Sequence, residues 1–168
     1  MDDRELVQQQ LGRSPRAFRR VAARCPYGGP AVTEQDPYDV NGQPFPTTYY
    51  LTCPHLVAAV SRLEAAGGVE RWSAAVAASV ELQGDLAAAT AEQRRIRHEL
   101  ADDRSGADGG ASLDWGIGGS RHPEQLKCMH AHVGFALANP GYRIGERMLS
   151  EVPQTWPLGR CCTEGVGA

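Results

Sequence analysis

The chain has 168 residues, an apolar content of 42% and a formal net charge of −3. This length suits one folded domain, and the composition is that of a globular protein rather than a disordered one. Apolar runs such as Ala74–Ala78 are far shorter than a membrane-spanning helix requires, and the acidic N-terminus lacks the pattern of a secretory signal. We therefore expect a cytoplasmic protein without membrane association, whose cysteines are normally reduced.

The N-terminal part of the chain has the pattern of a short helix followed by a small antiparallel sheet. Acidic residues in the first turn and a stop at Gly12 favour a helix over residues 3–11. Residues 21–25, 30–34 and 47–53 have strand-like composition, and the last of these is rich in β-branched and aromatic residues. Because turn residues separate the segments, they predict about three antiparallel strands.

From Pro54 the composition changes to helix-forming residues. The pattern predicts a helix from Pro54 to Gly67, one over residues 69–83 with a break at Gly84, one over 85–101 and one over 123–138. We therefore expect an α+β fold in which about four helices pack on the sheet, as a single domain over residues 1–150. Residues 151–168 are rich in Pro, Gly and small polar residues, which predicts a flexible C-terminal tail; its Cys161 and Cys162 receive no role.

Three cysteines lie in short motifs that carry further metal-binding or nucleophilic groups. Cys25 and Cys53 each end a predicted strand, so both sulfurs come out at one sheet edge if the strands are neighbours with level ends. Cys128 and His132 are four residues apart in the last predicted helix and share a face. We therefore predict a zinc-type site that joins the sheet edge to this helix. Its predicted ligands are Cys25, Cys53, Cys128 and His132, with His130 and His55 in reserve.

Two other interpretations of these residues stay open, because known structural zinc modules carry two close pairs, such as two cysteines separated by two residues, and the three motifs contain no such pair. In one, the chain is a cysteine- or metal-dependent hydrolase or transferase acting on a phosphorylated or acyl substrate. Cys53 is its candidate nucleophile at a helix start, and His55, His130 or His132 is its base. In the other, the cysteines are buried and inert, and the chain is a metal-free module that binds a protein partner.

Arginine is concentrated between Gly12 and Cys25, where no acidic residue occurs. Guanidinium groups bind phosphate and carboxylate through paired hydrogen bonds, so Arg13, Arg16 and Arg24 are candidates for binding an anionic small molecule. The alternative is a solvated face, or arginines that pair with nearby acids. Nucleic-acid binding is disfavoured because the cluster is short and the whole chain is acidic.

The order of the motifs resembles a known family. These motifs include Arg24–Pro30, Leu51–Leu56 and Lys127–His132. Over residues 11–145 the chain resembles the bacterial domain-of-unknown-function family 501, which is found mainly in actinobacteria. That family has no assigned activity, so the resemblance implies neither a substrate nor a catalytic residue.

Overall fold

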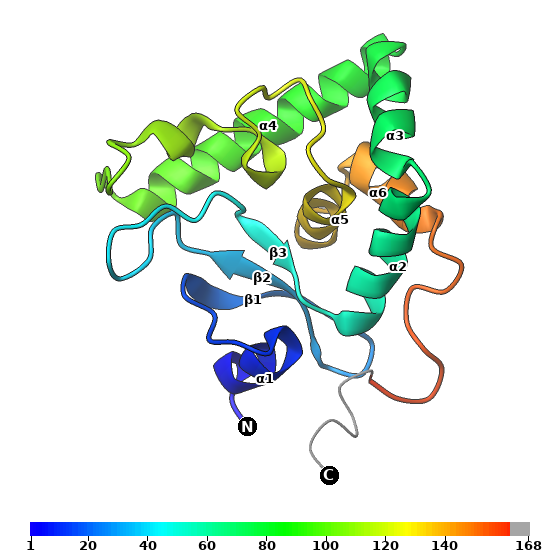
Figure 1. Ribbon diagram of the computed structural model, residues 1–168, viewed down its shortest axis with the longest axis horizontal. Coiled ribbons are helices and arrows are strands. Elements are labelled where there is room, and N and C mark those ends of the chain that lie inside the picture. Colours follow the sequence, from blue (N-terminus) through cyan, green and yellow to red (C-terminus); the bar gives the residue numbers. More distant parts are fainter. Residues whose placement is uncertain (162–168) are drawn as a thin grey trace.

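The computed structural model describes residues 1–161 and contains a three-stranded sheet. Its strands are β1 (Phe18–Arg24), β2 (Pro30–Gln35) and β3 (Tyr49–Leu51), in the order β1-β2-β3 with both pairs antiparallel. The central strand β2 is buried along its whole length. One helix lies on one side of this sheet and the other helices lie on the opposite side (Figure 1). The predicted α+β fold with strands in the N-terminal half is therefore confirmed.

Six α-helices and two short 3-10 turns complete the described structure. Within residues 1–161, none of these helices combines the length and apolar character needed to cross a membrane. The helices are α1 (Asp3–Leu11), α2 (Pro54–Ala65), α3 (Gly68–Ala77), α4 (Val80–Ala101), α5 (Met129–Ala138) and α6 (Arg143–Ser150), and the 3-10 turns are η1 (Ala111–Asp114) and η2 (Ile117–Gly119).

Local capping explains where several helices begin. Asp2 accepts a hydrogen bond from the backbone N–H of Glu5, whose side chain binds back to Asp2, which is a complete capping box for α1. Ser79 accepts from the N–H of Leu82 and begins α4. The break between α3 and α4 therefore lies at Ser79, and the predicted break at Gly84 is wrong, because that glycine lies inside α4.

The last part of the chain differs from the sequence expectation in two ways. Helix α5 begins at Met129 rather than near Pro123, and Cys128 is its N-cap residue with extended backbone. Helix α6 was not predicted. This helix buries Ile144 and Met148, which are spaced i, i+4. Because the helix has only about two turns, its hydrophobic periodicity is too short to be recognised in the sequence.

Helix α5 is central to the core and is apolar on nearly all sides, as expected of a buried helix. It packs against β3 and α6, and two glycines permit the close approach. A Cβ atom at Gly134 would lie 3.0 Å from the backbone oxygen of Tyr49, and a Cβ atom at Gly145 would overlap the backbone oxygen of His132. The main core also contains Val32, Leu51, Leu56, Val60, Trp72, Met129, Val133, Phe135, Ile144 and Met148.

Candidate functional site

The sheet topology brings Cys25 and Cys53 to the same end of the sheet. Strands β1 and β3 both run antiparallel to β2, so they terminate at the same end of the sheet, where β2 begins. Arg24 pairs with Pro30, and the backbone N–H of Cys53 donates to the oxygen of Ala31 at 3.3 Å. The strand ends are thus level, although the two strands flank β2 instead of pairing with each other. Both cysteine side chains are buried.

Cys25 lies in a tight turn whose backbone N–H groups face its sulfur. The N–H of Gly28 donates to the oxygen of Cys25 at 3.0 Å, and the positive φ of Gly28, 83°, closes the turn. Burial raises the pKa of the Cys25 thiol, whereas hydrogen bonds from the N–H groups of Tyr27 and Gly29 act to lower it. The turn therefore supplies donors that favour a sulfur carrying negative charge.

The segment after α6 packs over this end of the sheet. The Tyr27 hydroxyl donates to the oxygen of Pro157 at 2.5 Å and accepts from the N–H of Gly159 at 2.9 Å. The His55 Nε2 atom lies 2.8 Å from the oxygen of Gln154. These contacts position Cys161 beside Cys25, and their Sγ atoms lie 3.8 Å apart. Figure 1 shows this segment descending beside α2 toward the sheet.

Cys161 is the residue of this site that sequence reasoning missed. It is 5% exposed and therefore as buried as a core residue. Its neighbour Cys162 lies outside the described residues, as does the rest of the predicted tail up to residue 168. The one sequence signal was that the Cys161–Cys162 pair is preceded by bulky residues such as Trp156 and Leu158, which a purely polar tail would lack.

Cys128 and His130 lie elsewhere, at a groove with a volume of about 600 Å³. The groove runs between the end of α1, strand β3, the start of α2 and the start of α5. Burial raises the pKa of the Cys128 thiol, although the N–H groups of Ala131 and His130 oppose that shift. The rest of the lining is Gln10, Leu11, Thr47, Tyr50, Leu51, Thr52, Pro54, Val57, Ala58 and Ala131.

His130 is held between two side chains of α2. Its Nδ1 atom lies 3.0 Å from Glu64 Oε1, and its Nε2 atom lies 3.1 Å from Ser61 Oγ. The same Glu64 oxygen accepts the N–H of Met129 at 2.6 Å, so the carboxylate also caps the first turn of α5. Sequence reasoning did not find this cluster, because Glu64 and His130 are 66 residues apart.

His132 points into the core, where it meets neither Cys25 nor Cys53. Its Nδ1 atom lies 2.7 Å from the hydroxyl of Tyr142, and its Nε2 atom is buried without a hydrogen-bond partner among the described residues. Burial lowers the pKa of His132 to about 4, so the ring is neutral at physiological pH. The i, i+4 argument for Cys128 and His132 does not hold, because Cys128 is the N-cap and lies outside the helix.

The four predicted zinc ligands are therefore divided among three places: the sheet end, the groove and the core. Within residues 1–161, no three His, Cys, Asp or Glu side chains are grouped closely enough to hold a metal ion. The closest approach to the predicted arrangement is at the sheet end. There Cys25 has a thiol neighbour, and Cys53 occupies the N-cap position of α2 that the sequence predicted. Cys53 is only 1% exposed, which does not suit a nucleophile.

The three candidate anion-binding arginines do not converge. Arg16 pairs with Asp39 at 2.9 Å, near the start of β1, whereas Arg24 pairs with Asp3 at 2.6 Å at the opposite end of that strand. A strand of seven residues spans roughly 20 Å, too far for both to bind one small anion. Arg16 and Arg24 therefore pair with nearby acidic residues, which was the alternative to an anion site.

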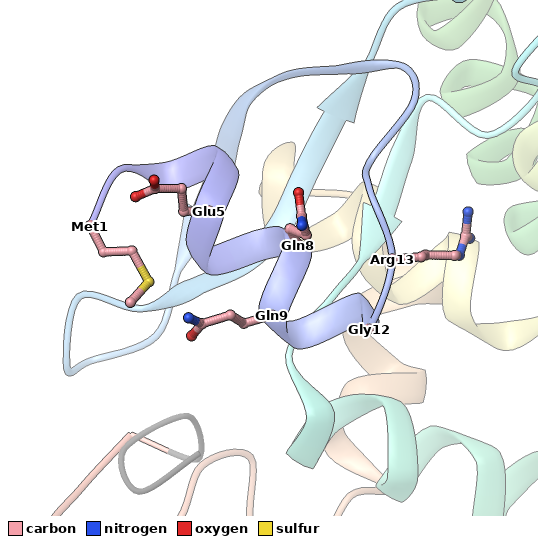
Figure 2. Close-up of a pocket in the computed structure, with 6 residues that line it drawn as sticks. All are labelled: Met1, Glu5, Gln8, Gln9, Gly12 and Arg13. Atoms are coloured by element: carbon pink, nitrogen blue, oxygen red, sulfur yellow. The ribbon is translucent and has the colours of Figure 1, made fainter. Parts of the chain in front are cut away.

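Arg13 follows α1 and lines a hollow of about 540 Å³ on the exposed side of that helix. Figure 2 shows its side chain directed away from Met1, Glu5 and Gln9, which line the other side of the hollow. The hollow thus combines one arginine with one glutamate, Glu5, and its lining contains no second guanidinium group that would bind an anion together with Arg13.

The fold and these sites define an α+β protein with a buried thiol pair at one end of its sheet and a separate histidine-containing groove. The chain belongs to the DUF501 family of proteins of unknown function, whose model matches residues 21–150. Arg13, Arg16 and Cys161 lie outside the matched range. No curated protein and no solved structure matches the chain.

Proposed function

We propose that this protein binds a zinc-type metal ion at the end of its sheet, and that the metal fastens the C-terminal segment to the domain. Cys25 and Cys161 are the first two ligands. The observation that carries this proposal is the distance of 3.8 Å between their sulfur atoms. A disulfide bond is about 2.05 Å long, so the two sulfurs are not covalently joined at this distance.

The spacing has a direct geometric meaning. Two thiolates that bind one tetrahedral zinc at about 2.3 Å lie about 3.8 Å apart, because this is the edge of the coordination tetrahedron. A hydrogen bond between two thiols has a similar length. A metal-binding experiment therefore has to distinguish a pair of metal ligands from a hydrogen-bonded pair of thiols. In either case two of the ligands already lie at the distance that one metal ion requires, and binding brings the remaining ligands to them.

The turn around Cys25 supports the metal-bound form. Thiolate ligands of structural metals are stabilised when surrounding groups donate hydrogen bonds to the sulfur. The N–H groups of Tyr27 and Gly29 are such donors. A bound cation would also offset the burial that raises the pKa of the Cys25 thiol, because it binds the deprotonated sulfur.

Cys53 and Cys162 are the candidates for the remaining positions. Cys53 is buried at the same end of the sheet, after β3, and Cys162 follows Cys161 in the sequence but lies outside the described residues. This set replaces Cys128 and His132, which lie in the groove and the core. It keeps the predicted role for Cys25 and Cys53 and moves the metal from the last helix to the C-terminal segment.

Cobalt titration tests the proposal on the purified, metal-depleted full chain. Tetrahedral cobalt bound by thiolates absorbs strongly through sulfur-to-metal charge transfer and visible d–d bands. We expect these bands to saturate at one cobalt per chain and to be lost in Cys25→Ser. The matched control Cys128→Ser is expected to keep them. A wild-type chain without thiolate–cobalt bands would contradict the proposal.

A further inference from the structure

The structure points to a second site, which the metal proposal does not involve: we propose that Ser61, His130 and Glu64 form a nucleophile, base and positioning acid that hydrolyse esters of short apolar acyl groups. The three side chains are connected through His130, which lies 3.0 Å from Glu64 and 3.1 Å from Ser61. Serine, histidine and a carboxylate in this order are the groups that acyl-transfer enzymes of several unrelated folds use.

The hydrogen bonds fix the tautomer of His130 in the way this chemistry requires. Glu64 Oε1 can only accept, so the His130 Nδ1 atom carries the proton that they share. The Nε2 atom of the neutral ring is then an acceptor for the hydroxyl of Ser61. Once Nε2 has taken the serine proton, the oxygen of Val57 at 3.2 Å is an acceptor for it. The carbonyl oxygen of Val57 thus favours the protonated form of the base, which the reaction creates.

The groove beside His130 indicates the class of substrate. The lining described above contains several apolar side chains. Its ionisable side chains are those of His130, Cys128 and Tyr50, and it contains no Asp, Glu, Lys or Arg. Such a lining favours an uncharged acyl group. Val57 lines the groove and lies one helical turn before Ser61 on α2, and Ser61 itself is exposed.

The reaction follows in two balanced steps. Ser61 Oγ attacks the ester carbonyl carbon while its proton passes to His130 Nε2. The carbon–oxygen bond of the ester then breaks, and the departing alcohol takes that proton, which leaves an acyl group on Ser61. Water attacks the acyl carbon and gives a proton to Nε2, which returns it to Ser61 as the carboxylic acid leaves. Glu64 acts through His130 and is therefore a positioning residue.

The test uses the purified full chain, a fluorescent fluorophosphonate that labels activated serines, and p-nitrophenyl butyrate as the ester. We expect the wild type to be labelled at Ser61, and Ser61→Ala to lose both the label and at least about 100-fold in ester hydrolysis. Because Ser61 is exposed, this variant keeps its fold, which thermal unfolding verifies. Ser105→Ala, an exposed serine in the loop after α4, is the matched control and keeps both signals.

The positioning role has its own readout. In Glu64→Gln we expect the pH dependence of hydrolysis to shift, since the charge beside His130 is removed, whereas a purely structural role would lower activity equally at all pH values. Absence of fluorophosphonate labelling in the wild type would overturn the proposal. Hydrolysis that survives Ser61→Ala but is lost in Cys128→Ser would overturn the assignment of Ser61 as the nucleophile.

Discussion

The sulfur atoms of Cys25 and Cys161 lie 3.8 Å apart although 136 residues separate them in the sequence. This contact closes the C-terminal segment over the end of the sheet, where β1 and β3 both terminate. A metal ion held by both sulfurs would stabilise the folded chain, because an unfolded chain has to close a long loop before it can bind the same ion with both cysteines. The contact is therefore the point at which the stability of the segment and that of the domain are coupled.

Tyr27→Phe is expected to loosen the C-terminal segment without unfolding the domain. The hydroxyl that is removed binds both Pro157 and Gly159, and hydrogen bonds of this kind contribute about 1 kcal/mol each. Hydrogen exchange of the backbone amides in residues 152–161 should therefore accelerate several-fold, with the exchange of β2 unchanged. Equal acceleration in β2 would mean that the segment and the sheet open together.

Two glycine substitutions in helices should have opposite effects on stability. In Gly145→Ala the new methyl group meets the backbone of His132 and the side chain of Ala136, so we expect a loss of about 1–3 kcal/mol. Gly84 also lies in a helix, but nothing is within 4 Å of a Cβ atom there. Gly84→Ala should gain about 0.5–1 kcal/mol from the higher helix propensity of alanine. Urea unfolding of both variants provides the comparison.

Stability should fall as the pH decreases from about 6.5 to about 4, because His132 is buried in its neutral form. The unfolded chain binds a proton on this histidine below about 6.5, whereas the folded chain does so only below about 4. Over that window the difference is worth up to about 3 kcal/mol. His132→Gln, measured by urea unfolding at several pH values, should lack this decline. His98→Gln, an exposed histidine of α4, should retain it.

Arg97 should be the arginine whose loss costs most. Its side chain is fully buried and donates to the backbone oxygens of Ser112 and Phe45, and these bonds tie α4 to η1 and to the loop before β3. Arg97→Met leaves those acceptors without a partner, and we expect a loss of about 3 kcal/mol in urea unfolding. Arg95→Met is the control on the same helix. Arg95 is exposed and pairs with Glu92 and Glu99 of the same helix, so its loss should cost less than about 1 kcal/mol.

Much of the fold was predictable because its signals are local. The strand predicted over residues 47–53 contains β3, although β3 covers only Tyr49–Leu51, and the proline in the first helical turn correctly marks the start of α2. The junction between them predicts a helix N-cap at Cys53, and this residue is the N-cap of α2. Helix α6 was missed because two buried residues over two turns give too weak a periodicity.

The sites were less predictable because they depend on contacts between distant segments. Level strand ends bring Cys25 and Cys53 to the same end of the sheet but on opposite sides of β2, whereas the sequence argument required the two strands to be neighbours. Cys161 could not be foreseen, since its position depends on the hydrogen bonds of Tyr27 and on a Pro- and Gly-rich segment with the composition of a tail. The pairing of Glu64 with His130 likewise requires knowledge of how α2 and α5 pack.

The most direct test of the central claim is the metal content of the untagged protein, purified without chelator, in the wild type, Cys161→Ser and Cys128→Ser. Our account predicts about one zinc per wild-type chain, retention of that zinc in Cys128→Ser and its loss in Cys161→Ser. Zinc that is lost in Cys128→Ser but kept in Cys161→Ser would contradict it and return the site to the last helix. A wild type without bound metal that also fails to bind added zinc would contradict it outright.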